Sequence, residues 1–560
     1  MTESSTGPAP RLRCFEPLAL AIAGAILVGS VILVLGMIEE PYHIDELRQV
    51  RAYPRPVAQV IDLSFGQEQP PLDSLIGKAV YEIVGQGHIR QRLHPTILGM
   101  VSLGLFAWLL WRAGLRWAVP VAVLVYSIVP IVVSMTAYAR QYSLPVFLWL
   151  VFLNGAELWL RRRSWLGFGA AMGAAVLLPL SRSIDPVIFL VAAAAALVGW
   201  RVTGRLGSVA GSPLPLIGVT LASVAVVGIP VVLRIRSEAA EFIAPAAGLG
   251  ERMTRLVTDL PAALAESSTA WPVATAVVVL AIASPRVRRF AAEAWWFWPL
   301  VLVPVGFASA FFLLANTGQP FFHRYTYSWW IPFAILSGLI IEEAVDTASE
   351  GTAGLRYLVG AAAVGLTALF LAGALARDLT SDDWTDYEPL GALITSELER
   401  DVAVYFDNLR PLGLYRPGYA GYGRFTKHQV PLTLSVIRDP FTVDADAPFV
   451  VALNGPALDV PGWEPVYASP NMYLYLPDTI PSGHLAAAAT LLEFGRALDA
   501  DTGGTLRLAG ASLLLAAGQP ETACDEVELL LSEDLSLTET VDRVIAGHPL
   551  ADAVEVCGAG

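Results

Sequence analysis

The chain has 560 residues, of which 55% are hydrophobic and only 15% are charged. This composition is too apolar for a soluble protein of that length, and it is typical of a protein that crosses a membrane several times. The formal net charge of −14 argues against a nucleic acid as partner, because binding to a phosphate backbone needs clustered cationic side chains.

The first apolar run, residues 17–38, is not followed by a small-residue cleavage site, so we expect a membrane anchor and not a removed signal. The three cysteines, Cys14, Cys524 and Cys557, are scattered along the chain. Their spacing indicates neither a metal site nor a disulfide.

Eleven apolar segments predict membrane-spanning helices, since about 20 apolar residues cross the hydrocarbon core of a bilayer. They lie near 17–38, 95–111, 118–134, 143–160, 166–180, 186–200, 213–233, 271–284, 295–315, 327–342 and 357–376. We therefore expect an α-helical polytopic membrane domain over residues 1–376.

The loops between these segments alternate in charge. One set carries the arginines Arg11, Arg13, Arg112, Arg116, Arg161, Arg162, Arg163, Arg201, Arg205, Arg286, Arg288, Arg289 and Arg356. The positive-inside rule places this set, and with it the N-terminus, in the cytoplasm. An odd number of spans then places everything after residue 376 outside the membrane, so we expect a multi-pass protein of the cell membrane with an extracytoplasmic C-terminal region.

The first outer loop, residues 39–94, is long and holds the amphipathic stretches 43–52 and 72–84. These stretches are expected to lie along the interface as helices, and Pro70-Pro71 must interrupt any helix between them. Residues 250–266 predict another surface helix.

After residue 376 the composition becomes polar. Strand-like runs at 402–406, 448–453 and 472–476 alternate with turns and predict a small α/β domain over residues 377–480. Residues 481–560 have a helical pattern, with a helix pair around Gly518-Gln519-Pro520. We expect this last region to be a structural cap or a partner-binding surface.

A four-residue cluster, His43-Ile44-Asp45-Glu46, follows the first span directly. Carboxylates at a membrane surface are costly to desolvate, so their presence there indicates a site. They could serve as general base, metal ligand or proton relay. The alternative is that they are solvated residues that cap a loop helix.

Three outer turns carry an arginine next to aromatic or acidic residues. They are Ala139–Tyr142, Ser181–Asp185 and His323–Tyr325. The planar guanidinium matches phosphate oxygens and keeps its charge at a membrane surface. One carboxylate cluster and three cationic turns on the same face suit a substrate with a phosphate and a lipid tail. The alternative for each arginine alone is interfacial snorkelling or an ion pair.

At these residues the sequence resembles the GT-C superfamily of membrane glycosyltransferases, which includes protein O-mannosyltransferases and the lipid A aminoarabinose transferase. The resemblance covers roughly residues 15–410. Asp45-Glu46 is similar to the acidic motif of the first outer loop, and Gln69-Pro70-Pro71-Leu72 is similar to a His-Pro-Pro-Leu segment in which glutamine replaces the histidine. Three further matches are Ala139-Arg140-Gln141-Tyr142, His323-Arg324-Tyr325 and Asp383-Trp384-Thr385-Asp386-Tyr387.

The resemblance implies a GT-C transmembrane bundle with about 11 transmembrane helices and a reaction on the outer face of the membrane. The donor would be a polyprenyl-phosphate-linked sugar, and the acceptor would be a lipid, a glycan or a protein. Asp45 would be the general base, and Glu46 would orient the acceptor or hold a divalent metal ion. His43, with the two carboxylates, could bind such an ion.

The resemblance also implies roles for the cationic turns. Arginines would neutralise the leaving polyprenyl phosphate, with neighbouring residues as hydrogen-bond partners. The arginines are Arg140, Arg182 and Arg324, and the partners are Tyr142, His323 and Tyr325.

Two other classes of function are compatible with the composition. A secondary transporter would place its charged groups near the bilayer midplane, commonly on broken helices of repeated halves. We find no repeat, and the charged groups here fall at the ends of spans. A non-enzymatic envelope scaffold does not need a large acid-bearing first loop.

Overall fold

A computed structural model describes residues 15–39, 46, 49–50, 52–66, 69–85, 88–182, 184–204, 210–239, 254, 256, 258–261, 271–311, 323–349, 354–380, 403–406, 435–437, 450–453, 463–469, 472–477, 488, 492, 507, 510–511, 514–515 and 518–533. The chain divides into two compact units. One comprises Met1–Glu40 and Arg48–Ser381, and the other comprises Pro41–Leu47 and Asp382–Gly560. The boundaries predicted at residues 376 and 480 stay predictions.

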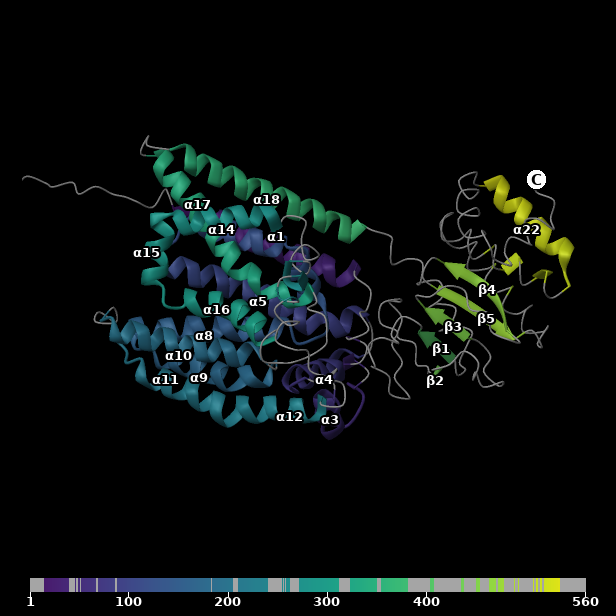
Figure 1. Ribbon diagram of the computed structural model, residues 1–560, viewed down its shortest axis with the longest axis horizontal. Helices are drawn as coiled ribbons and strands as arrows, with labels where there is room; N and C mark the ends of the chain where they lie inside the picture. The colour runs from purple at the N-terminus through teal and green to yellow at the C-terminus, as the bar shows by residue number, and fades with distance from the viewer. Residues whose placement is uncertain are drawn as a thin grey trace, which may run out of the picture. The chain divides into compact units, whose positions relative to one another are not determined.

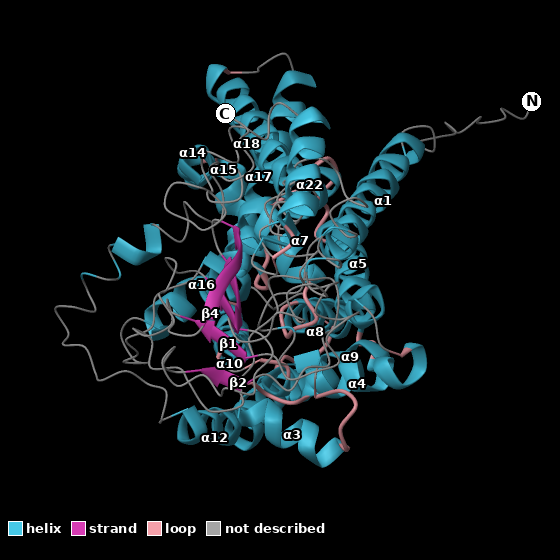
Figure 2. Cartoon of the chain, turned by 90° about the vertical axis from the view of Figure 1, so that its right-hand side faces the viewer, coloured by secondary structure: helices cyan, strands magenta, loops and turns pink. Residues whose placement is uncertain are grey.

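Within its described residues, the first unit consists of helices and turns (Figures 1 and 2). The helices are α1 (Phe15–Glu39), α3 (Val57–Gly66), α4 (Leu72–Val84), α5 (His88–Arg112), α6 (Ala118–Ser127), α7 (Pro130–Ala137), α8 (Ser143–Arg162), α9 (Trp165–Leu177), η2 (Leu178–Leu180), α10 (Asp185–Val202), α11 (Leu214–Ser223), η3 (Val224–Gly228), α12 (Ile229–Ala239), α14 (Trp271–Ala283), α15 (Pro285–Glu293), α16 (Phe297–Ser309), η5 (His323–Trp329), α17 (Trp330–Ser349) and α18 (Leu355–Thr380).

Each of the eleven predicted spans coincides with one helix or with consecutive helices. In the described part of the chain, six helices are long and apolar enough to cross a membrane, or up to eight if each of two bent pairs counts as one span. The pair α6 and α7 bends by 68°, where Pro130 begins α7, and the pair α15 and α16 bends by 95°. The predicted fold class, a polytopic helical membrane protein, is confirmed.

Small residues let the helices of this bundle approach closely. A Cβ atom added at Gly155 of α8 would lie 2.6 Å from the carbonyl oxygen of Gly167 and 2.8 Å from the amide nitrogen of Ala171, both in α9. Such close backbone contact is the usual way in which membrane helices pack, because lipid gives them little hydrophobic reason to associate.

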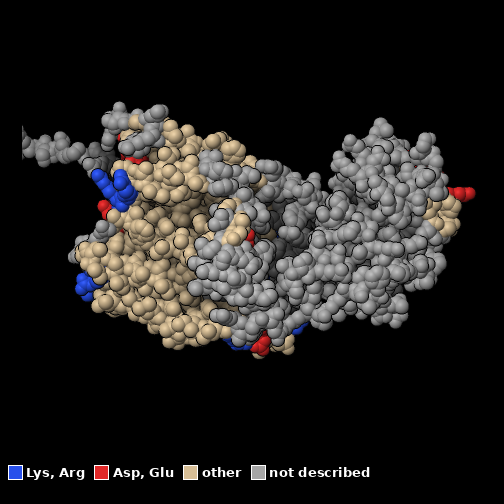
Figure 3. Space-filling model, viewed as in Figure 1, with Lys and Arg blue, Asp and Glu red and all other residues tan. Residues whose placement is uncertain are grey.

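Carboxylates of α17 hold the arginine-rich end of the bundle together. Glu342 accepts hydrogen bonds from the backbone amides of Arg116 and Ala118, at 2.8 and 3.0 Å, and so caps the start of α6. The guanidinium of Arg286, in α15, lies 2.6 Å from the same carboxylate. On the face drawn in Figure 3, the described surface of the helical unit is nearly free of charged side chains, and charges gather near its ends.

The helices of the first outer loop lie at the other end of this unit from α15 (Figure 1). α4 matches the predicted stretch 72–84, and the prediction of a helix there is confirmed. α3 was not predicted; it packs on α12, where the guanidinium of Arg234 lies 3.9 Å from the centre of the Phe65 ring. The opposite placement of α15 and the first outer loop is the geometry that the charge pattern predicts.

The second unit contains a five-stranded sheet of order β2-β1-β3-β5-β4. β2 and β3 both pair with β1 in parallel, and β5 pairs antiparallel with β3 and β4. The strands are β1 (Ala403–Phe406), β2 (Ser435–Ile437), β3 (Val450–Leu453), β4 (Trp463–Ser469) and β5 (Met472–Pro477). The three predicted strand runs are confirmed as β1, β3 and β5.

The helix α22 (Pro520–Glu533) belongs to the second unit and carries Cys524, which is disulfide-bonded. The expectation of no disulfide was wrong. Disulfides form between cysteines that are close in space, and spacing along the chain does not reveal such a pair.

We predict that Gly155→Ala destabilises the helical unit, because the added methyl group meets backbone atoms that have little room to move. Overpacking of this kind costs about 1–3 kcal/mol. The measurement is the midpoint of thermal unfolding of the purified protein in detergent. Gly169→Ala, in α9, is the matched control, because a Cβ atom there meets no atom within 4 Å. Equal midpoints for the two variants would contradict the prediction.

Candidate functional site

The site centres on the turn 138–142, which joins α7 to α8. Two short backbone hydrogen bonds shape it: the amide of Arg140 donates to the carbonyl of Tyr138, and the amide of Tyr142 donates to the carbonyl of Arg140, both at 2.7 Å. Tyr142 then precedes the first residue of α8. Tyr138, Arg140 and Tyr142 each contact a different polar group, so the turn connects three clusters.

The first cluster contains Arg140, which is only 7% exposed. With its carboxamide oxygen toward the arginine, Gln69 accepts from the Nε of Arg140 at 3.1 Å. The Gln69 nitrogen donates to Oε1 of Gln49 at 3.1 Å. Gln49 in turn donates to Oδ2 of Asp73, in α4, at 2.6 Å. A continuous chain of hydrogen bonds thus joins a carboxylate to the arginine.

Asp73 also lies beside His94 of α5, with 3.5 Å between Oδ1 and Nε2. Both side chains are buried. Nδ1 of His94 has no hydrogen-bond partner within the described residues. The chain of hydrogen bonds therefore ends in a buried carboxylate and imidazole that hold α4 against α5.

The second cluster surrounds Arg182, which is 5% exposed. Its Nη1 lies 2.7 Å from Oδ2 of Asp185, at the start of α10. The same oxygen accepts a hydrogen bond from the hydroxyl of Tyr327, in η5, at 3.1 Å. The guanidinium carbon lies 4.8 Å from the ring centres of both Tyr142 and Tyr327. Cation–π contact and the carboxylate together replace the water that burial removes.

The charge of Arg182 follows from its surroundings. Burial alone would lower the pKa of the Arg182 guanidinium, but the negative charge of Asp185 raises it above its ordinary value. Arg182 is therefore charged, and the carboxylate of Asp185 balances that charge while it accepts the hydrogen bond from the hydroxyl of Tyr327.

The third cluster contains Arg92 of α5, which is fully buried. Its Nη1 lies 3.5 Å from the carbonyl oxygen of Met37, near the end of α1. Its guanidinium carbon lies 5.8 Å from the centre of the Tyr138 ring. A cation near the carboxyl end of a helix is favourable because the last carbonyl groups lack amide partners.

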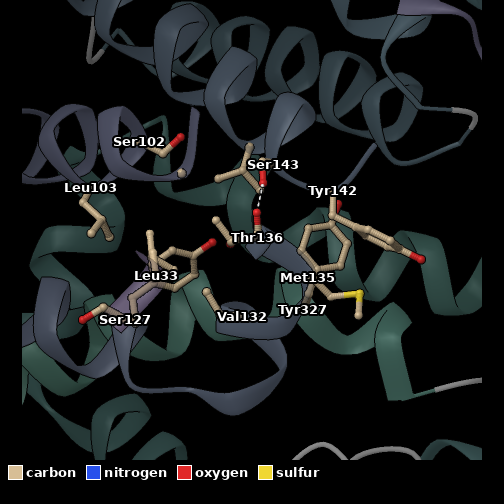
Figure 4. Close-up of a pocket in the computed structure, with 13 residues that line it drawn as sticks. Leu33, Ser102, Leu103, Ser127, Val132, Met135, Thr136, Tyr142, Ser143 and Tyr327 are labelled. Carbon is tan, nitrogen blue, oxygen red and sulfur yellow. Dashed lines mark hydrogen bonds between the residues drawn. The ribbon is translucent and has the colours of Figure 1, made fainter. Parts of the chain in front are cut away.

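A small cavity lies next to the turn, between α1, α5, α6, α7, α8 and η5. Figure 4 shows Tyr142 and Tyr327 at one side of it and Leu33 at the other. The hydroxyl groups of Ser102, Ser127 and Ser143, which line it, each donate to a backbone carbonyl. The cavity therefore offers few groups to a polar ligand, and we do not assign it to a sugar.

The structure brings three of the predicted site residues, Arg140, Tyr142 and Arg182, to this turn. A fourth, Tyr325, belongs to η5, and its ring lies 5.5 Å from the ring of Phe307. The guanidinium of Arg182 lies 5.8 Å from the same phenylalanine ring. The arginine turns at 139–142 and 181–185 and the η5 segment are thus joined by side-chain contacts.

The remaining predicted residues are less fully described. Glu46 is helical and buried, and it falls in the segment Pro41–Leu47 of the second unit. His43 and Asp45 lie outside the described residues. His323 and Arg324 belong to η5, but their side chains lie outside the described part. Among the described residues, no group of three or more histidine, cysteine, aspartate or glutamate side chains could hold a metal ion.

Sequence reasoning missed several contributors to the site. They are Gln49, Asp73, Arg92, His94 and Tyr327. Gln49 and Asp73 lie in amphipathic stretches, where a polar residue is expected to face solvent. Arg92 and His94 lie in the first turns of α5, just before the predicted span, and no motif marks them. Tyr327 lies two residues after the predicted Tyr325 and could have been included with it.

No family model matches the chain, and no curated protein gives a significant match. Solved structures do resemble it. ArnT from Cupriavidus metallidurans bound to undecaprenyl phosphate is 13% identical, with a TM-score of 0.46, over 82% of this chain and 97% of that one. The same protein in the apo state is 13% identical, with a TM-score of 0.47, over 83% and 98%.

A third structure is the archaeal oligosaccharyltransferase AglB from Archaeoglobus fulgidus, in complex with an inhibitory peptide and a dolichol-phosphate. It is 12% identical, with a TM-score of 0.43, over 77% of this chain and 69% of that one.

We predict that Asp185→Asn destabilises the protein strongly, because it leaves the charge of Arg182 buried without its carboxylate. Breaking one partner of a buried ion pair costs about 3–5 kcal/mol. The matched control is Asp62→Asn, which removes the exposed pair between Asp62 and Arg234, 3.5 Å apart. An exposed pair contributes about 0–1 kcal/mol. Thermal unfolding in detergent compares the two; a smaller loss for Asp185→Asn than for Asp62→Asn would contradict the prediction.

Proposed function

We propose that this protein is a membrane glycosyltransferase that moves a sugar from a polyprenyl-phosphate donor to an acceptor. The observation that carries the proposal is the turn 138–142, which contains Arg140 and contacts two further buried arginines. The ring of Tyr138 lies near Arg92, and the ring of Tyr142 lies near Arg182. Buried guanidinium groups at a membrane end suit a phosphate that carries a lipid tail.

The convergence of distant segments supports the same proposal. Tyr142 and Tyr327 stack edge to face, with ring centres 5.5 Å apart, and so join the turn 138–142 to η5. η5 also contains His323 and Arg324. Three segments that resemble GT-C motifs, around residues 69, 140 and 324, are therefore connected through Gln69, Arg140, Tyr142 and Tyr327.

We propose Asp45 as the general base of the transfer. Its carboxylate would take the proton of an acceptor hydroxyl while the acceptor oxygen forms a bond to the anomeric carbon of the sugar. The bond from that carbon to the phosphate oxygen would break, and the polyprenyl phosphate would leave with the electron pair. Attack from the face opposite the leaving group inverts the anomeric centre. Glu46 would orient the acceptor or, with His43, hold a divalent ion.

The arginines would act on the leaving group. Negative charge grows on the phosphate as the glycosidic bond breaks, and donors already oriented toward it stabilise that charge without reorganisation. We propose Arg140 and Arg324 as direct phosphate contacts, with His323 and Tyr325 as hydrogen-bond partners. Arg182, already paired with Asp185, would contribute charge and keep Tyr142 in place.

A secondary transporter and an envelope scaffold remain the alternatives from the sequence. The described arginines of the site lie in turns or in the first turns of a helix, and none lies in the middle of a span. A transporter would instead place them near the midplane. This placement favours the glycosyltransferase.

We predict that Asp45→Asn abolishes sugar transfer at normal membrane expression, since the amide cannot accept the proton. The test incubates membranes that contain the variant with undecaprenyl-phosphate-linked sugars and follows release of undecaprenyl phosphate. Removal of a general base lowers the rate by about a hundredfold to ten-thousandfold. Asp62→Asn, an exposed residue of α3, is the control for expression and folding. Retained release in Asp45→Asn would remove Asp45 from the role of base.

We also propose that the C-terminal region lies outside the cell membrane and the N-terminus inside. The disulfide of Cys524 supports this, because such bonds persist in oxidising compartments. In intact cells that express a Cys14→Ser variant, a membrane-impermeant maleimide is expected to label the protein only after treatment with a membrane-impermeant reductant. Labelling that appears only after cell lysis would place the C-terminal region in the cytoplasm.

A further inference from the structure

We infer that Gln69, Gln49 and Asp73 form a relay that positions Arg140 for the phosphate of its ligand. This inference rests on the proposed function, and it assigns to the three residues a role that the sequence motifs do not give them. They act through Arg140 and are positioning residues.

In the relay each side chain donates a hydrogen bond to the next one, from Arg140 to Asp73. Asp73 accepts from Gln49 at 2.6 Å, Oε1 of Gln49 accepts from Gln69 at 3.1 Å, and Gln69 accepts from Arg140. All four side chains are buried. In a buried site each of these hydrogen bonds is stronger than it would be in water, and a displaced partner would leave a buried polar group unsatisfied.

The residues at the base of the relay are closely packed. Gln49 also donates to the hydroxyl of Tyr53 at 3.2 Å, and a Cβ atom added at Gly77, in α4, would lie 2.2 Å from that hydroxyl. Asp73 is held by its position in α4 and by His94. The position of α4 therefore fixes the position of the Arg140 guanidinium through these hydrogen bonds.

The carboxamide of Gln69 suits this task better than a carboxylate. It accepts from the guanidinium with one end and donates to Gln49 with the other, so it orients Arg140 without adding a negative charge. A carboxylate at the same place would compete with phosphate for the guanidinium. Asp185 makes such a contact with Arg182, at 2.7 Å. At its contact with Gln69, therefore, Arg140 meets a neutral group.

Substitutions at Gln69 test the relay in the full-length protein, with undecaprenyl phosphate as the probe and native mass spectrometry as the binding measurement. Gln69→Glu is expected to weaken binding by about tenfold or more, because the new carboxylate competes with the phosphate. Gln69→His is expected to keep binding within about threefold, because a neutral imidazole also accepts from one side and donates from the other. If Gln69 had only a structural role, the two variants would bind undecaprenyl phosphate equally well whenever their thermal stabilities are equal.

Gln59→Glu is the matched control, since it makes the same change on the exposed face of α3. Its binding is expected to equal that of the parent. Gln49→Leu breaks the relay one step further from Arg140 and is expected to weaken binding even if Gln69→Glu fails to fold. Unchanged binding in Gln69→Glu, or in Gln49→Leu where the first variant does not fold, would overturn the inference.

Arg140→Gln, measured in parallel, separates the inference from the function on which it rests. If Arg140→Gln binds undecaprenyl phosphate as tightly as the parent, the phosphate site proposed at the turn is wrong. If Arg140→Gln binds weakly but Gln69→Glu binds normally, the phosphate site stands and the relay is wrong.

Discussion

The burial of guanidinium groups around one five-residue turn is the constraint on which the rest of this site depends. A charged side chain removed from water is costly unless other groups replace its hydration. Around the turn 138–142 these groups come from four separate segments: the carbonyl of Met37 from α1, Gln69 from the first outer loop, Asp185 from α10 and Tyr327 from η5. The need to satisfy the arginines therefore draws distant parts of the chain together at one end of the bundle.

The way in which each arginine is satisfied suggests a division of roles. Arg182 contacts the carboxylate of Asp185 directly and lies against the rings of two tyrosines. These contacts stabilise the fold and occupy much of the surface of its guanidinium group. Arg140 contacts the carboxamide of Gln69. In the chain of hydrogen bonds that begins there, Gln69 and Gln49 separate Arg140 from the carboxylate of Asp73. A guanidinium held in this way is preorganised for an anion, which is the property that a leaving phosphate requires. Gly155 lets α8, which follows the turn, pack closely on α9.

Apolar periodicity and charge alternation predicted much of the helical unit. Each of the eleven predicted spans coincides with helical residues where the structure describes it, and six of the described helices, or up to eight with the bent pairs, are long and apolar enough to cross a membrane. α4 begins and ends where its amphipathic pattern does. The motifs at 140 and 182 also come together. The sequence could not reveal that Gln69 contacts Arg140, because that pairing depends on how the first outer loop folds back on the bundle. No motif in the sequence marks Arg92 or His94, which lie just before a predicted span. The spacing of the cysteines along the chain did not indicate the disulfide of Cys524.

A structure of the full chain with undecaprenyl phosphate bound would show whether the turn 138–142 binds the phosphate. We predict that a phosphate oxygen lies within hydrogen-bond distance, about 2.7–3.2 Å, of the guanidinium of Arg140. We also predict that Gln69 keeps its contact with that side chain in the complex. A phosphate bound elsewhere, with no ligand at the turn 138–142, would show that Arg140 does not bind it.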